Sequence, residues 1–422
     1  MKRKVEKYFS NILNSFLLLH PVLDLLTSIG IKTMLIPFSL GSIIRILFLI
    51  FVMYSVLFVY KKRKVGWYYL FTFIYIVGFV ISIVLYENGN NMLGELQKTL
   101  KTFYFPLLLI SIYPIKAEIK WSTKHLITTL MIYLILIFIP EILNIGFDSY
   151  EITKEGSVGF FYSANEISAI VSILTPLFIL YLFDGKINIT KVFIFIIYIT
   201  VILNLGTKTP FLALIITSAL FMFWFLMKKK ILKSLIKTYI LALTLIAVVT
   251  LGAYIIPKTT FYKNINIHLD FLEVKDINDI FEDPQLIDHF IFSQRLSFLD
   301  NKAKIYEKVN IPQKMFGIGY YENNKESKMI EMDYFDIYYS HGIIGFVLFF
   351  SIYTYILIDI VKKSYLIIKD KKTYSIFICI IFILVLSLFT GHIIIAPAVS
   401  YISVYIIMYL EKACQNKIKK LN

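Results

Sequence analysis

Several ionisable side chains lie inside long apolar segments or at their ends. His20 and Asp24 are one helical turn apart, Lys98 and Lys101 are three residues apart, and Arg45 lies about five residues into another apolar segment. Because an ionised group in hydrocarbon is costly, such residues are functional candidates by default. Further candidates are polar residues at the ends of apolar segments or in the connections between them: Asn165, Glu166, Lys208, Arg295, Glu331, Asp333 and His392.

These residue types suit a reaction of a phosphorylated substrate. Guanidinium and ammonium groups match phosphate oxygens, and the cations expected at one depth are Arg45, Lys98, Lys101, Lys208 and Arg295. Carboxylate and imidazole groups can accept a proton. We therefore expect a wet, cationic cavity that opens to one side of the membrane.

Each candidate also has a structural interpretation. Lys98 and Lys101 could extend to lipid headgroups, and Asp24 with Arg45 could be an ion pair that joins two helices. His20 precedes Pro21 and could be a packing residue, and Glu331 with Asp333 could solvate the end of a loop.

The composition indicates a membrane protein. Of 422 residues, 58% are hydrophobic and 17% are charged, and the mean hydropathy is +0.74. Soluble domains carry about 25% charged residues. The net charge of +15 resides in short Lys-rich clusters between apolar segments, which is typical of cytoplasmic loops and argues against nucleic-acid binding. Cys379 and Cys414 are too far apart in the predicted topology to pair, and we expect no metal site.

Long apolar segments, several of which exceed the roughly 18–20 residues needed to span hydrocarbon, predict an all-α, polytopic helix bundle of about twelve transmembrane helices. The basic clusters place both termini in the cytoplasm. The predicted spans are 9–28, 40–60, 66–86, 96–113, 124–142, 163–183, 190–205, 209–227, 238–256, 336–360, 374–390 and 394–411.

Residues 257–335 form the one long polar stretch, with 13 acidic and 10 basic residues. We expect a large extracytoplasmic loop with short amphipathic helices, because a structureless loop of this length is unusual. Residues 293–309 are the best helix candidate, with Ser293 as its N-cap. Arg295 in the first turn is unfavourable beside the helix dipole and suggests an anionic partner elsewhere. The predicted division is 1–256 for helices 1–9, 257–335 for the loop, and 336–422 for helices 10–12 with a basic tail.

Four short stretches, in order, are similar to the O-antigen polymerase and O-antigen ligase superfamily of bacterial polysaccharide assembly. They are Tyr162–Glu166, Gly206–Pro210, Ser293–Leu296 and Glu331–Gly345. A fifth, Gly391–Pro397, resembles members from low-GC Gram-positive bacteria.

The resemblance implies a metal-independent glycosyltransferase, without a cofactor, that acts on polyprenyl-diphosphate sugars. It implies that Lys208 and Arg295 bind the diphosphate and that Asn165 and Glu166 contact substrate. Ligase members often carry a His where this chain has Glu331-Met-Asp333, so the base stays open among Glu331, Asp333 and His392. The acidic pair is favoured because it begins the most specific of the matching stretches, whereas His392 has the intrinsic pKa better suited to proton transfer near neutrality.

The expected function is a polysaccharide polymerase in the bacterial cytoplasmic membrane, joining undecaprenyl-diphosphate-linked units for capsule, exopolysaccharide or cell-wall polymer. A ligase that moves finished glycan to a terminal acceptor is the first alternative, and a flippase or exporter is the second. Partners beyond the lipid-linked oligosaccharide and membrane lipids would be a flippase and a chain-length regulator of the same pathway.

Overall fold

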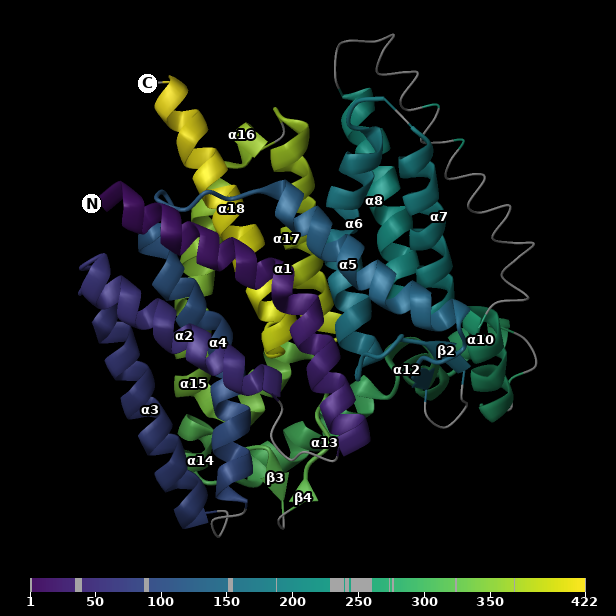
Figure 1. Ribbon diagram of the computed structural model, residues 1–422. Coiled ribbons are helices and arrows are strands. Elements are labelled where there is room, and N and C mark those ends of the chain that lie inside the picture. The colour runs from purple at the N-terminus through teal and green to yellow at the C-terminus, as the bar shows by residue number, and fades with distance from the viewer. Residues whose placement is uncertain are drawn as a thin grey trace.

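The computed structural model describes the chain except for residues 1, 35–39, 87–90, 151–154, 187, 228–238, 240–242, 244–259, 273, 275, 276, 323, 324, 368 and 422. The described part is a bundle of long helices, with the short helices of residues 260–316 at one end (Figure 1). Both labelled termini lie at the opposite end. This confirms the predicted fold class.

The first half of the bundle contains eight helices. They are α1 (Lys2–Met34), α2 (Leu40–Tyr54), α3 (Val65–Tyr86), α4 (Met92–Ile112), α5 (Thr123–Ile142), α6 (Ala164–Phe183), α7 (Ile189–Asn204) and α8 (Lys208–Leu226). A π-helical turn, η1 (Ser55–Val59), continues α2, and a 3₁₀ turn, η2 (Tyr113–Ile115), follows α4. A hairpin of β1 (Asp148–Tyr150) and β2 (Glu155–Ser157) precedes α6.

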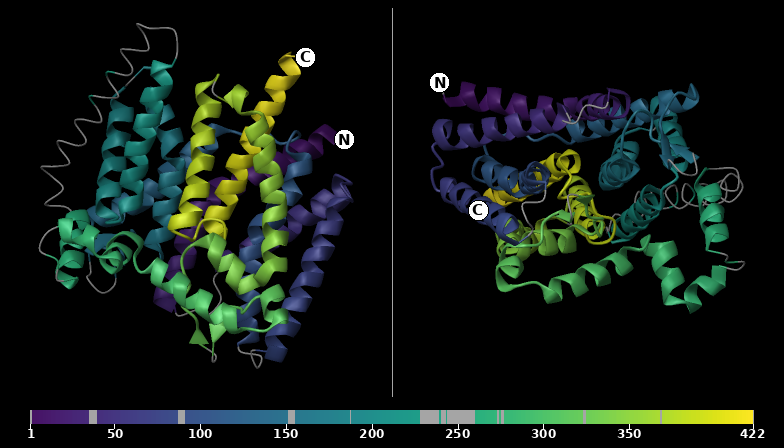
Figure 2. Two further views of the ribbon diagram at one scale, coloured as in Figure 1. Left: turned by 180° about the vertical axis from the view of Figure 1, so that it is seen from behind. Right: turned by 90° about the horizontal axis from the view of Figure 1, so that it is seen from below.

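Short elements fill the stretch between α8 and the second group of long helices. They are α10 (Thr260–Phe271), α11 (Ile277–Glu282), α12 (Pro284–Phe292), α13 (Arg295–Lys308), α14 (Ile311–Phe316) and the hairpin β3 (Tyr321–Glu322) with β4 (Lys325–Glu326). Seen from below, α12 and α13 lie along one side of the bundle (Figure 2). The short helices that we predicted for this loop are therefore present.

The last helices are α15 (Asp333–Lys362), α16 (Ser364–Ile367), α17 (Lys371–Phe389) and α18 (Pro397–Leu421). α15 is kinked at Gly342, whose φ is 64°. A Cβ at this position would lie 2.5 Å from the backbone nitrogen of Gly317, so glycine lets the end of α14 pack against the kink.

Eight helices in the described residues are long and apolar enough to cross a membrane: α1, α2 with its π-helical turn, α3, α5, α6, α8, α15 and α17. α7 is apolar but has only 16 residues, and α4 and α18 do not meet the criterion. The predicted span 238–256 lies outside the described residues. The count of twelve is therefore not reached in this part of the chain.

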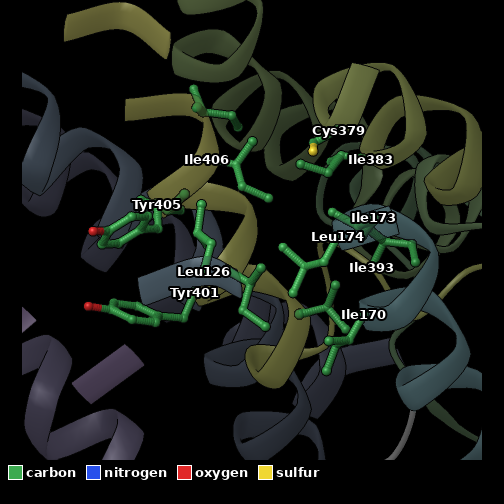
Figure 3. Close-up of a cluster of buried hydrophobic side chains, with 14 of the residues drawn as sticks. Leu126, Ile170, Ile173, Leu174, Cys379, Ile383, Ile393, Tyr401, Tyr405 and Ile406 are labelled. Carbon is green, nitrogen blue, oxygen red and sulfur yellow. The ribbon is translucent and has the colours of Figure 1, made fainter. Parts of the chain in front are cut away.

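The core near the end of α17 is apolar and holds α5, α6, α17 and α18 together. Figure 3 shows Ile170, Leu174, Ile383 and Ile393 close together, with Leu126 beside them, whereas the Tyr401 ring points away from this group. Leu126 belongs to α5, Ile170 and Leu174 to α6 and Ile383 to α17, and each of these side chains is at most 1% exposed. Ile393 belongs to the connection between α17 and α18, so this core fixes the backbone next to His392.

Candidate functional site

A cavity of about 310 Å³ lies among α1, α2, α4, α6 and the segment that precedes α18. The segment before β3 also contributes to its lining. Residues far apart in the sequence meet there, among them six of the ionisable candidates: Asp24, Arg45, Lys98, Lys101, Glu166 and His392.

Arg45 lies in a buried polar cluster on one side of the cavity. Its Nη2 forms an ion pair with Asp24 Oδ1 and lies 3.4 Å from Nε2 of His20. Tyr133 of α5 donates its hydroxyl proton to the other oxygen of Asp24. The side chains of Arg45 and Asp24 are only 7% and 12% exposed. The pair therefore joins α1 to α2 while its guanidinium still borders the cavity.

α4 places two more cations on the cavity. Lys98 and Lys101 are three residues apart and so lie on the same side of this helix. Lys98 donates to Oε1 of Glu326 in β4, with 2.5 Å between Nζ and the oxygen. The side chain of Lys98 is 28% exposed, so this contact leaves it in reach of water.

Glu166 brings a carboxylate into the cavity from the first turn of α6. Its backbone N–H donates to the side chain of the N-cap residue Ser163 at 3.4 Å. No hydrogen bond or ion pair joins its carboxylate to another side chain in the part of the chain that the structure describes. Asn165 is exposed beside it and does not line the cavity.

His392 is held between the cavity and Glu331. Its Nε2 lies 4.0 Å from Oε1 of Glu331, whose Oε2 accepts from Nη2 of Arg295 at 2.9 Å. Burial alone would lower the pKa of His392, but the close contact with Glu331 and the negative charges of Glu166 and Glu331 raise it above 6.5. For Glu331, burial would raise the pKa of the carboxyl group, but His392 and Arg295 outweigh this effect and lower the pKa to about 2.

The backbone at these two residues adopts an unusual conformation. Glu331 and His392 have φ values of 61° and 58°, in the left-handed region that non-glycine residues rarely occupy. Gly391 allows the two segments to touch, since a Cβ there would lie 2.5 Å from the carbonyl oxygen of Glu331. Such strain persists only when the surroundings impose it, and it is frequent at functional sites.

Asp333 anchors the segment that carries His392. Its fully buried Oδ2 accepts the backbone N–H groups of Ile393 and Ile394 at 2.9 and 2.8 Å. Asp336, which the sequence did not single out, accepts the N–H groups of Ile330 and Met332 at 2.9 and 3.0 Å. These two carboxylates shape both segments that meet at Glu331 and His392.

The anionic partner expected for Arg295 is Glu331, and Arg295 lies in the first turn of α13, as predicted. Ser293 as N-cap is wrong. Gln294 occupies that position, and its side chain makes no capping hydrogen bond. The backbones of Ser293 and Gln294 are both in the left-handed conformation. Asp288 of α12 satisfies the helix start instead, accepting from the N–H groups of Leu296 and Ser297 at 2.9 Å each.

Lys208 begins α8 and does not line the cavity. Its Nζ donates to the carbonyl oxygen of Phe290 at 2.7 Å and lies 4.0 Å from the centre of the Phe290 ring. Arg295 and Glu331 are also outside the lining. Lys208 and Arg295 therefore lie apart from the cations that line the cavity, and the diphosphate contacts expected for these two residues stay a prediction.

The hydroxyl groups around the cavity were not predicted from the sequence. Tyr133 binds Asp24, and Thr102 and Tyr320 line the cavity. Isolated Thr and Tyr residues are common in apolar helices and loops, so their type carried no signal. Only their position beside ionisable groups identifies them.

The O-antigen ligase like membrane proteins match this chain over residues 6–285 and 278–413. No curated protein matches it. The matched ranges cover most of the chain, and the apolar helices agree with a multi-pass membrane protein. The chain therefore belongs to the O-antigen ligase like family, membrane glycosyltransferase-type enzymes that ligate or polymerise glycans.

Proposed function

We propose that this protein is a polysaccharide polymerase. It transfers oligosaccharide units from polyprenyl diphosphate at the outer face of the bacterial cytoplasmic membrane, for capsule, exopolysaccharide or wall polymer. The observation that carries the proposal is the cavity that gathers Arg45, Lys98 and Lys101 beside His392. It combines cations for a diphosphate with a group that can take a proton.

The cations serve the leaving group. Breaking the bond between the anomeric carbon and the phosphate oxygen leaves negative charge on the diphosphate. Preorganised cations stabilise charge that develops in a transition state. Arg45 has a planar fork that can bind two phosphate oxygens, whereas Lys98 and Lys101 act as point charges. This stabilisation uses no metal, and we propose a metal-independent reaction.

His392 serves the attacking group. The neutral imidazole takes the proton of the acceptor hydroxyl while the oxygen of that hydroxyl forms the bond to the anomeric carbon. The nearby Glu331 carboxylate stabilises the imidazolium that results, and Arg295 holds Glu331 in place. Asp333 is a positioning residue, because its bound oxygen is committed to the backbone of the His392 segment.

Glu166 is assigned to substrate binding, as its carboxylate borders the cavity without a partner among the described side chains. Lys208 and Arg295 stay outside the primary diphosphate site in this proposal. A flippase and a chain-length regulator would supply substrate and set the length of the product.

The test is incubation of purified protein with a lipid-linked repeat unit. A ladder of products supports a polymerase, and a single shifted acceptor would assign a ligase. The absence of any covalent product would leave transport as the alternative.

A matched pair of variants tests the role of His392. His392→Gln should lower the rate by about 10²- to 10⁴-fold, the usual contribution of a general base. His125→Gln, in the first turn of α5 and outside the cavity lining, should keep the native rate. A native rate in His392→Gln would overturn the assignment of the base.

A further inference from the structure

A chain of hydrogen bonds runs from the cavity into the helix bundle. Thr102 and Tyr320 are both lining residues of the cavity, and their hydroxyl oxygens are 2.7 Å apart. Tyr320 Oη is 2.9 Å from Nε2 of His341, and Nδ1 of His341 is 3.0 Å from Oη of Tyr75. The four side chains come from α4, the segment before β3, α15 and α3, and none is more than 3% exposed.

The inner end of this chain fixes the direction of its protons. Tyr75 Oη lies 2.9 Å from the carbonyl oxygen of His341 and 3.3 Å from that of Phe316. A carbonyl can only accept, so the one hydroxyl proton of Tyr75 is used there. The contact with Nδ1 then requires His341 to donate from this nitrogen. A neutral imidazole that donates from Nδ1 accepts at Nε2.

The consequence passes outward to the cavity. Tyr320 donates its proton to Nε2 of His341, so its oxygen can only accept in the contact with Thr102. Thr102 must therefore donate its proton to Tyr320. The hydroxyls of Thr102 and Tyr320 both donate their single protons to groups of the protein. Toward a ligand, these two oxygens can therefore only accept hydrogen bonds.

The segment that carries Tyr320 is held rigidly. Glu95 Oε1 accepts the backbone N–H groups of Tyr320 and Tyr321 at 2.7 and 2.8 Å. The N–H of Gly319 donates to the carbonyl oxygen of Ser340 at 3.1 Å. A Cβ on Gly319 would lie 2.5 Å from Glu95 Oε1, so the approach needs glycine. Tyr320 thus keeps a fixed position against α4.

We propose that Thr102 and Tyr320 form a subsite that accepts a hydrogen bond from a sugar hydroxyl of the lipid-linked glycan. The proposal rests on the proposed function for its substrate class. Two hydroxyl oxygens that can only accept hydrogen bonds favour a ligand hydroxyl or amide N–H, and they disfavour a carboxylate or carbonyl oxygen. A site built to bind a hydroxyl discriminates strongly against an analogue that lacks it, because its polar groups are left unpaired. Tyr75 and His341 are positioning residues for this subsite.

The experiment compares two ligands on the purified full-length protein. One is the lipid-linked oligosaccharide extracted from cells that lack this protein, and the other is polyprenyl diphosphate without sugar. Tyr320→Phe and Thr102→Val should each weaken binding of the glycan-bearing lipid about tenfold, as expected for one lost hydrogen bond. Binding of the sugar-free lipid should change less than about twofold.

Further variants separate recognition from folding. Thr102→Ser keeps the hydroxyl and should restore native binding, and Tyr75→Phe should weaken binding of the glycan-bearing lipid alone. A matched control exists in the buried pair Thr175 and Tyr198, whose hydroxyls are also 2.7 Å apart but do not line the cavity. Thr175→Val and Tyr198→Phe should leave the binding of both ligands unchanged.

Equal binding of the glycan-bearing lipid by native protein, Tyr320→Phe and Thr102→Val would overturn the subsite. A native protein that binds both lipids equally would overturn it as well. If native protein prefers the glycan-bearing lipid but forms no product, the proposed polymerase fails while the comparison of variants still decides the subsite. A thermal unfolding midpoint for each variant, with Thr102→Ser as reference, shows whether a loss of binding follows from unfolding.

Discussion

Replacing Asp24 by Asn should lower the free energy of unfolding by about 3–5 kcal/mol, the usual cost of leaving one partner of a buried ion pair alone. The asparagine keeps an oxygen that can accept the hydrogen bond from Tyr133, so the interaction that is lost is the ion pair with Arg45. With 7% of its side chain exposed, Arg45 has little access to water in place of the carboxylate. At about 1.4 kcal/mol per factor of ten, the ratio of folded to unfolded protein falls roughly 100- to 4,000-fold.

The assay is thermal and chemical unfolding of purified protein, together with its abundance in membranes. The double variant Asp24→Asn with Arg45→Gln removes both charges and should recover part of the loss. The exposed pair Lys304 and Asp300, with 66% and 61% of the side chains accessible, provides the control. Asp300→Asn should cost less than about 1 kcal/mol.

Two results would refute this reasoning. If Asp24→Asn unfolds at the same midpoint as Asp300→Asn, the buried pair contributes no more than a surface pair. If the double variant is less stable than Asp24→Asn alone, the uncompensated charge of Arg45 is not the cause. An Arg45→Ala variant of normal abundance that forms no product would instead support its role at the diphosphate.

Three further predictions concern the segments around the cavity. His392 must be neutral to act as the base, so the rate of the native protein should fall as the pH drops through the raised pKa of His392. Glu331→Gln removes the negative charge that raises this pKa and should move the fall in rate to lower pH. An unchanged pH–rate profile in Glu331→Gln would contradict the coupling of the two residues. Gly391→Ala places a methyl group 2.5 Å from the carbonyl oxygen of Glu331 at a φ of 62° and should lower both the unfolding midpoint and the rate, and native values in both would show that the two segments separate freely. Asp288→Asn weakens the cap of α13 and should cost about 1 kcal/mol in chemical unfolding; an unchanged midpoint would assign the helix start to another group.

The helical parts of the fold were predictable because apolar length is a local property of the sequence. The spans predicted around α2, α3, α5 and α6 agree with the helices to within a few residues. α1 is longer than predicted, since polar residues at its two ends, such as Arg3 and Lys32, continue the helix beyond the apolar stretch. The predicted capping of α13 failed because the cap comes from the preceding helix α12, a tertiary contact that local spacing does not reveal.

The residue types that meet at the candidate site could be predicted from the sequence, but not the contacts between them. Costly charges in apolar segments identified Asp24, Arg45 and His392, and the odd placement of Arg295 indicated an anionic partner. That Glu331 is the partner depends on a contact across 36 residues, and on left-handed backbone that no residue type there requires. The roles of Asp333 and Tyr320 depend on bonds to backbone and to a buried imidazole, which composition and spacing do not encode.

The anchor formed by Asp333 has a consequence for how the cavity can change. Its carboxylate holds the backbone of Ile393 and Ile394, not their side chains. The adjoining residues Ile395 and Pro397 line the cavity. A substitution at Ile395 can therefore alter the shape of the cavity wall without removing the bonds that hold the segment. Protein engineering aimed at a different sugar would begin there, with the anchor kept and a small library at this position.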